Sequence, residues 1–321
     1  MGYATVLGAC LATACVVGGC HKADSATGDD DAQVDAAPPD ADIPAGFQML
    51  VERSWSVAKP TSSASVDAYR CVIAQVPTDM WISGFRSLAP LGSHHAVLTI
   101  TAKSQVGNND NCTPEDSLAD KEMLYASGVG TDDYEFPDGV AVHLAAGTYI
   151  NLNLHLYNAS DADLSGTSGV LVKTVDQATV TQEAGMIFSG SLSFTVPKDA
   201  GMNGAQPYPV IGQCHAAEDF HIVALWPHMH KIAMHHKFTL NGAALLDTDF
   251  SFEDQKNYPI TDTVVHQGDT LQTTCSYVNT TGAAVPFGEQ SNDEMCFTGV
   301  YRYPAATGVA SEIACAMGNP I

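Results

Sequence analysis

The chain has 321 residues, and its 36 acidic side chains outnumber the 13 Lys and Arg, which gives a formal net charge of -23. Such a field repels phosphate backbones and argues against nucleic acid as a partner. The length, together with a hydrophobic fraction of 45%, supplies a core for two domains or for one large β domain.

The N-terminal stretch MGYATVLGACLATACVVGGC contains an apolar run that is short for a bilayer span and ends in small residues before Cys20. VGGC is typical of a bacterial lipobox, so residues 1–19 are predicted to be a lipoprotein signal peptide and Cys20 to carry the lipid. Against this, no Lys or Arg precedes the run, and LGAC at Cys10 is a competing match. An ordinary secretory signal is the alternative, and with either signal the mature chain is exported.

The segment after Cys20 has almost no large apolar side chains. Residues 20–45 are rich in Asp, Ala and Pro. Such a composition cannot form a core, and it predicts a disordered acidic linker that acts as a tether.

Six cysteines remain beyond the linker: Cys71, Cys112, Cys214, Cys275, Cys296 and Cys315. An even number in an exported chain predicts three disulfides. None belongs to a Cys-x-x-Cys pair, which argues against a structural zinc site or a thioredoxin-like motif.

After residue 46, apolar and polar residues alternate in runs that are separated by Gly, Pro, Asn and Asp. The predicted strands include HHAVLTITA, GTYINLNLHLYN, MIFSGSLSFTV, FHIVALW, HKFTLNGAALL and DTLQTTCSYVN. Long helical periodicity is nearly absent, and PEDSLADKEMLYA, at 114–126, is the best candidate for a short helix. We predict an all-β protein of sandwich type, with a junction near residue 180 between domains at 46–180 and 181–321.

Three histidines in the first of these domains could bind a metal. His94 and His95 begin a predicted strand after a turn, and adjacent strand residues face opposite ways, so both reach one metal only at a strand end or a bulge. His155 lies on the polar face of a strand whose other face carries Ile150 and leucines. On its own, such a histidine is more often a surface or hydrogen-bonded residue than a ligand.

The second domain holds a denser group in ALWPHMHKIAMHHKF. His228 and His230 are two residues apart, which on a strand puts both rings on one face, and Pro227 predicts an edge or irregular strand. His235 and His236 are interpreted as exposed strand-end residues, with an accessory metal pair as the alternative.

Met295 stands in a polar, acidic setting, GEQSNDEMCF, which is unusual for a side chain that commonly fills cores. A thioether combined with two imidazoles is a soft ligand set that suits Cu(I) better than zinc or magnesium. The sequence therefore offers Met295 as a third ligand beside His228 and His230.

Together these motifs resemble the copper type II, ascorbate-dependent monooxygenases, the family of peptidylglycine α-hydroxylating monooxygenase and dopamine β-monooxygenase. The resemblance runs from about residue 46 to the C-terminus. It implies a first copper bound by His94, His95 and His155, and a second bound by His228, His230 and Met295. A family histidine seven residues before the His-x-His motif corresponds to His221.

The resemblance further implies two tandem antiparallel β-sandwich domains of jelly-roll type, each with one copper site, that face each other across a solvent-filled cleft. The first site would store an electron from a reductant such as ascorbate, and the second would bind dioxygen and the C–H group of the substrate. It also implies the disulfides Cys71–Cys112, Cys214–Cys315 and Cys275–Cys296.

The sequence departs from the family at five positions. Ala96 replaces a Met after the histidine pair, Met229 a Thr within the His-x-His motif, and Ala233 a Gly beyond it. Gly299 replaces a Tyr, and Trp226 replaces the Arg that holds a substrate carboxylate in the peptide-hydroxylating member. These changes argue against an amidating substrate, and Trp226 favours an apolar or aromatic one.

We therefore expect a copper-dependent monooxygenase that hydroxylates a C–H group of a small organic substrate with dioxygen and a reductant such as ascorbate. It would hold two coppers per chain, and its catalytic residues would be His228, His230 and Met295. An exported copper-binding or redox lipoprotein without turnover is the alternative, and a metal-free adhesion sandwich is a third possibility. We expect a monomer at the bacterial cell envelope, held to the membrane only by its lipid anchor.

Overall fold

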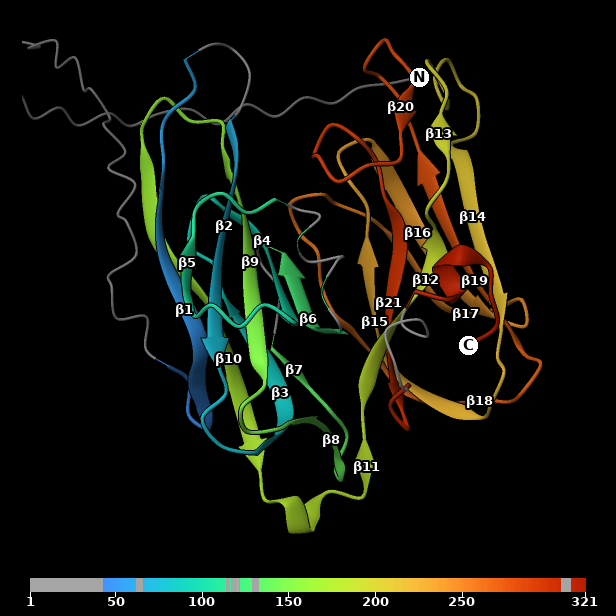
Figure 1. The fold of residues 1–321 in the computed structure, drawn as a ribbon. Helices are drawn as coiled ribbons and strands as arrows, with labels where there is room; N and C mark the ends of the chain where they lie inside the picture. Colours follow the sequence, from blue (N-terminus) through green and yellow to red (C-terminus); the bar gives the residue numbers. More distant parts are fainter. Residues whose placement is uncertain are drawn as a thin grey trace, which may run out of the picture. The chain divides into compact units, whose positions relative to one another are not determined.

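A computed structural model of the chain describes residues 43–61, 66–113, 116, 120, 122–128, 133–306 and 313–321. The predicted signal peptide, Cys20 and nearly all of the predicted linker lie outside these residues. Regular structure in the described part consists almost entirely of β-strands, which confirms the prediction of an all-β protein (Figure 1). No described helix is long and apolar enough to cross a bilayer.

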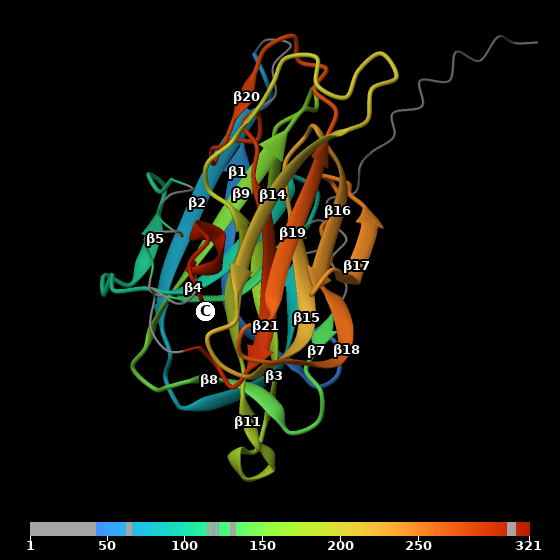
Figure 2. The same ribbon diagram turned by 90° about the vertical axis from the view of Figure 1, so that its right-hand side faces the viewer.

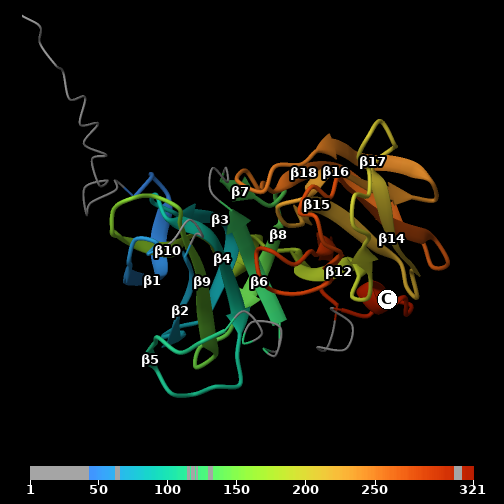
Figure 3. The same ribbon diagram turned by 90° about the horizontal axis from the view of Figure 1, so that it is seen from above.

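The N-terminal strands form two sheets. The first has the order β1-β10-β3-β8-β11, with β7 paired to β3. Its strands are β1 (Phe47–Val57), β3 (Met80–Leu88), β7 (Tyr134–Glu135), β8 (Val140–Leu144), β10 (Leu164–Val175) and β11 (Gln182–Glu183). The second has the order β5-β2-β9-β4-β6. Its strands are β2 (Val66–Gln75), β4 (Ser93–Ile100), β5 (Gly107–Asn109), β6 (Glu122–Gly128) and β9 (Tyr149–Asn158), and Figure 3 shows β9 between β2 and β4.

The C-terminal strands form two four-stranded sheets and a short pair. One sheet has the order β12-β21-β15-β18, with β12 (Gly185–Ser191), β15 (Phe220–His228), β18 (Tyr258–Val265) and β21 (Cys296–Tyr303). The other has the order β14-β19-β16-β17, with β14 (Tyr208–His215), β16 (Ala233–Leu240), β17 (Ala243–Asp249) and β19 (Thr270–Tyr277), and it is seen in Figure 2. β13 (Thr195–Val196) pairs with β20 (Val285–Pro286).

The N-terminal strands and the C-terminal strands pair only within their own set, but the hydrophobic cores of the two sets are joined. In the described part of the chain, no sheet mixes strands from 47–183 with strands from 185–303. One hydrophobic cluster nevertheless contains Tyr134 and Tyr301, whose stacked rings lie 5.1 Å apart, and residues 36–321 form one compact unit. The division into tandem domains near residue 180 therefore stays a prediction.

The described part of the chain also contains two short 3-10 segments, η1 (Gln177–Thr179) and η2 (Cys315–Met317). The predicted helix at 114–126 is wrong where it can be compared, because residues 122–126 belong to β6, although Asp116 is helical. The reason is that β6 is buried on both faces from Met123 onward, so its apolar residues run continuously and show no period of two.

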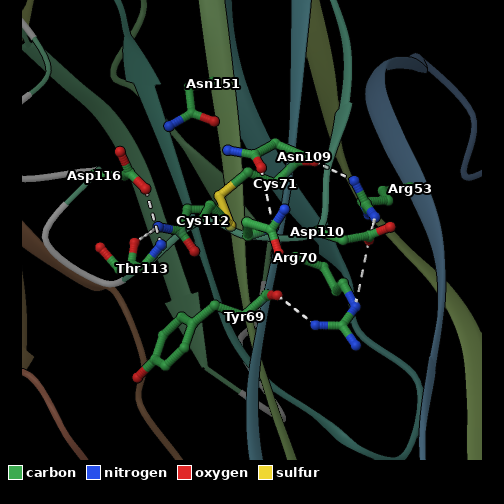
Figure 4. The surroundings of a disulfide bond; sticks show 12 residues. Arg53, Tyr69, Arg70, Cys71, Asn109, Asp110, Cys112, Thr113, Asp116 and Asn151 are labelled. Carbon is green, nitrogen blue, oxygen red and sulfur yellow. Dashed lines mark hydrogen bonds and ion pairs between the residues drawn. A yellow bond between two sulfur atoms is a disulfide. The ribbon is translucent and has the colours of Figure 1, made fainter.

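The described residues contain three disulfides, and they are the pairs that the family resemblance implied: Cys71–Cys112, Cys214–Cys315 and Cys275–Cys296. Figure 4 shows the first, which ties β2 to the loop after β5. Arg53 reinforces this loop, since it donates to the carbonyl of Cys71 and pairs with Asp110. Three disulfides indicate an exported protein that folds in an oxidising compartment.

Candidate metal centre

The first histidine group lies where β4 and β9 pair. His95 is opposite His155 in the antiparallel register, and the register shifts between Ser93 and His95. This irregularity lets two adjacent histidines share one site. The Nδ1 atoms of His94 and His95 lie 3.2 Å apart, and those of His95 and His155 lie 3.4 Å apart. We call these three residues the first cluster.

The polar face of β9 that carries His155 is buried, and of the two interpretations given for this histidine alone, surface or hydrogen-bonded, the hydrogen-bonded one agrees with the structure. His155 is 2% exposed. Asn151 donates to Asp120, and Asn153 donates to the carbonyl of Thr113, so Thr113 and Asp120 lie against this face. The leucines on the opposite face fill the core as predicted.

Asp67 determines which nitrogen of His155 is free to bind a metal. The Nε2 of His155 lies 2.7 Å from Asp67 Oδ1, and the Ser291 hydroxyl donates to the same oxygen. Burial acts to raise the pKa of Asp67, but hydrogen bonds with His155 and Ser291 outweigh it and hold that pKa at about 2. The ionised carboxylate can only accept, so Nε2 carries the hydrogen and Nδ1 keeps its lone pair toward the cluster.

His228 and His230 form the second group, at the end of β15. Their rings are perpendicular, with centroids 5.3 Å apart. β15 lies between β21 and β18 and is not an edge strand, but its pairing with both neighbours shifts register between Ile222 and Ala224, which agrees with the alternative of an irregular strand. Pro227 is nevertheless tolerated, because pairing to β18 ends at Leu225 and leaves that side of Pro227 without a ladder partner.

Hydrogen-bond acceptors orient the rings of His228 and His230, as Asp67 orients the ring of His155. The Nδ1 of His228 lies 2.7 Å from Gln255 Oε1, and the Nδ1 of His230 lies 3.1 Å from the carbonyl oxygen of Asp293. The Gln255 amide nitrogen donates to the carbonyl of Phe252, which fixes the orientation of this amide. Both Nδ1 atoms therefore donate, and both Nε2 atoms keep the lone pairs that a metal needs.

Glu294 connects the His-x-His turn to Met295. Its buried carboxylate accepts hydrogen bonds from the backbone N–H groups of His230, Ile232 and Met295, using both oxygens. Burial raises the pKa of Glu294 to about 8, against the effect of these donors. Met295 is 5% exposed and lines the same cavity as His228 and His230. We call His228, His230 and Met295 the second cluster.

This cavity has a volume of about 210 Å³ and also reaches His95 of the first cluster. Its remaining wall is mainly apolar and includes Val97, Met123, Phe188, Leu192, Trp226, Phe297 and Ile313. The Trp226 ring stacks on His228 with centroids 4.8 Å apart, so its flat face is already partly covered by a candidate ligand.

The two clusters adjoin, and the expected solvent-filled cleft between them is wrong. The ring centroids of His95 and His228 lie 5.7 Å apart. His94, His228 and His230 are all less than a tenth exposed. Side chains rather than open solvent therefore separate the candidate sites.

Burial keeps four of the candidate ligand histidines uncharged near neutral pH. It is the largest cause that lowers the pKa of His94 to about 3 and that of His228 to about 4, and it lowers the pKa values of His95 and His230 well below their usual range. A neutral imidazole keeps a lone pair for a metal. The first cluster offers three imidazoles, and the second offers two imidazoles and a thioether. Both ligand sets fit copper.

The remaining sequence candidates lie outside both clusters. His221 bonds to Asp262 and Tyr303. His235 is partly exposed and bonds to Asp247 and Asp249, as a surface residue would. His236 is fully buried and bonds to Thr298, so its interpretation as an exposed residue is wrong.

Several residues that shape the site were not predicted. They are Asp67, Phe252, Gln255, Ser291 and Glu294, which contact the histidines from other segments of the chain. Only Glu294 had a signal in the sequence, because it is an acidic residue directly before the candidate ligand Met295.

Residues 196–318 match the family model described as copper type II ascorbate-dependent monooxygenase, C-terminal domain. The second cluster lies within this match, and the first lies before it. No curated protein matches the sequence.

Two solved structures resemble this chain remotely. One is PNGase F, a glycosylasparaginase from Flavobacterium meningosepticum, at 9% identity over 80% of this chain and 97% of that chain, with a TM-score of 0.33. Another is the infectious bursal virus derived T=1 particle, at 9% identity over 86% and 73%, with a TM-score of 0.19. Neither likeness carries an argument about this chain.

Proposed function

We propose that this protein hydroxylates a C–H group of a small organic substrate with dioxygen and a reductant such as ascorbate, because residues 196–318 match the family model described as copper type II ascorbate-dependent monooxygenase, C-terminal domain. The observation that supports this most strongly is the placement of Met295, His228 and His230 around one cavity that also reaches His95.

Two copper ions per chain would be bound. The first would take the Nδ1 atoms of His94, His95 and His155, and the second would take the Nε2 atoms of His228 and His230 with the sulfur of Met295. When bound, copper supplies one-electron redox chemistry at the first cluster and dioxygen activation at the second. Met295 favours the reduced ion, because thioethers are soft ligands.

Neighbouring residues of the chain would orient the ligand side chains and exclude water from the cavity. Gln255 and the Asp293 carbonyl orient the rings of His228 and His230, and Glu294 fixes the backbone on either side of the site. The apolar wall of the cavity would exclude bulk water from the reacting C–H group.

The cavity also supports the expected class of substrate. Its wall is dominated by aliphatic and aromatic side chains, and Trp226 stands where a carboxylate-binding Arg would have been needed. An apolar or aromatic small molecule is therefore the substrate class that we propose. We further propose a monomer exported to the bacterial cell envelope and anchored there through Cys20.

Oxygen uptake by the copper-loaded protein tests this function. We expect ascorbate-dependent uptake that rises with an accepted substrate, two coppers per chain, and loss of uptake in Met295→Ala. Met317→Ala is the control, because Met317 is half exposed outside both clusters. Two coppers per chain without substrate-dependent uptake would favour the copper-binding redox lipoprotein, and absence of copper would contradict both.

A further inference from the structure

A second hollow reaches the first cluster from a different side. It is a groove of about 380 Å³, and its lining includes His94, Tyr157, Lys231, Ser251, Phe252 and Glu253. Among the described residues, none lines both this groove and the apolar cavity. The groove is therefore a separate approach to the first cluster, and His94 is where it meets that cluster.

Lys231 places one positive charge in the groove, and the exposed carboxylate of Glu253 lies in the same lining. The Nζ of Lys231 lies 4.8 Å from the ring centroid of Tyr157 and 5.8 Å from that of Phe252, and it donates to the side chain of Asn292. No carboxylate in the described part of the chain forms an ion pair with Lys231. In a chain of net charge -23, this ammonium is a localised attraction for a small anion.

The groove also has flat apolar surface beside a candidate ligand. The rings of His94 and Phe252 lie 3.9 Å apart between centroids. His94 Nε2 is buried and has no hydrogen-bond partner among the described residues. If Nδ1 binds the metal, Nε2 carries the hydrogen, and a buried donor without an acceptor is costly. His94 therefore lacks an acceptor at the end of the ring away from the first cluster.

We propose that this groove binds the reductant, a small planar enediol anion of the ascorbate type, and that the electron enters the first cluster through His94. The inference rests on the proposed function. Lys231 would neutralise the anion, the aromatic rings would contact its flat face, and an enediol oxygen would accept from His94. The exposed Glu253 and Ser251 would bond to its hydroxyl groups at the rim.

The electron transfer balances without a further reactant. The enediol monoanion would give one electron to an oxidised copper held by the first cluster, Cu(II), which would become Cu(I). It would also give one proton to solvent and leave as a radical anion. Two such anions supply the two electrons that insertion of one oxygen atom and formation of water require.

Binding to the metal-free protein tests the groove independently of copper. Titration calorimetry with ascorbate under anaerobic conditions should show one site per chain. Lys231→Met should weaken it about tenfold, since a charge-assisted hydrogen bond is lost. Lys231→Arg should retain most of the affinity, and Lys198→Met is the control, because Lys198 is an exposed lysine elsewhere on the chain. Equal affinities in the native protein and Lys231→Met would overturn the proposal.

Anaerobic reduction of the copper-loaded protein gives the second readout. The rate at which ascorbate removes the Cu(II) resonance should saturate, and Lys231→Met should need about tenfold more ascorbate for half the maximal rate. A neutral hydroquinone should reduce both proteins equally. If the copper content is normal, but the reduction rate does not saturate with ascorbate and is the same in Lys231→Met, the groove is not the reductant site. The proposed monooxygenase function would still stand. If the protein binds no copper, the proposed function is rejected. The calorimetric titration of the metal-free protein with ascorbate would still show whether the groove binds the reductant.

Discussion

His155 and Asp67 are joined across β9 and β2 by a hydrogen bond of 2.7 Å between Nε2 and Oδ1. The same carboxylate oxygen receives the hydroxyl of Ser291, which is 224 residues away in sequence. The orientation of one first-cluster histidine is thus determined by a strand of the N-terminal half and a loop of the C-terminal half.

Asp67→Asn should weaken copper binding at the first cluster about 10- to 100-fold, because the amide no longer supplies a charged acceptor for His155. Competition titration with a chelator of known affinity would measure this, and the second cluster should be unchanged. Asp262→Asn is the matched control, since Asp262 makes the same kind of bond to His221 outside both clusters. Equal losses in the two variants would contradict a specific role for Asp67.

Gln255→Leu should have the complementary effect. It removes the oxygen that accepts from His228 Nδ1, so affinity at the second cluster should fall about 10- to 100-fold while the first cluster binds normally. The measurement is the same chelator competition, with Gln272→Leu as a control in which only a bond to Thr274 is lost. Loss at both clusters would show that Gln255 acts on the fold rather than on His228.

Removing the Cys275–Cys296 disulfide should lower the free energy of unfolding by about 2 to 4 kcal/mol, as measured by urea denaturation. Since Cys296 directly follows Met295, we also expect weaker Cu(I) binding at the second cluster. The Cys71–Cys112 double variant is the matched comparison, with a loss of similar size and an intact second cluster. Unchanged stability in both would count against a structural role for these bonds.

His236 predicts a pH dependence of stability. Burial is the main reason that its pKa falls to about 3 in the folded protein, from 6.5 in an unfolded chain. Between these values the unfolded chain binds a proton that the folded protein does not. The free energy of unfolding should therefore fall with decreasing pH, by about 1.4 kcal/mol per pH unit from this residue. His236→Gln should remove that part of the slope in urea denaturation below pH 6.5.

His235 provides the control for this slope. Burial opposes its protonation, but hydrogen bonds with Asp249 and Asp247 outweigh that effect and raise its pKa. Its contribution to stability is complete below pH 6.5 and is lost as the pH rises through the raised value. His235→Gln should therefore leave the slope below pH 6.5 unchanged, and an equal change in both variants would exclude the burial of His236 as the cause.

The sequence was informative where strands have one buried face. The alternation in β9 predicted which side chains fill the core, and the runs at β4, β12, β15, β16, β17 and β19 correspond to predicted strands. Alternation does not reveal what covers the second face. For this reason the burial of Asn151 and His155 could not be predicted, and β6 was taken for a helix.

The candidate ligands could be predicted because soft side chains stand close together in sequence, as in His228 and His230. The residues that orient them could not. Asp67 lies 88 residues from His155, and Gln255 lies 27 residues from His228. A single Asp or Gln in a polar segment has many possible partners, and only folding selects one.

Two loops of the C-terminal half reach the first cluster, one through Phe252 at His94 and the other through Ser291 at Asp67 and His155. A fragment that ended near residue 180 would retain all three histidines and still lose these neighbours. Exchanging the C-terminal half for that of a homologue would accordingly change how tightly the N-terminal histidines hold a metal ion, although none of those three histidines had been altered.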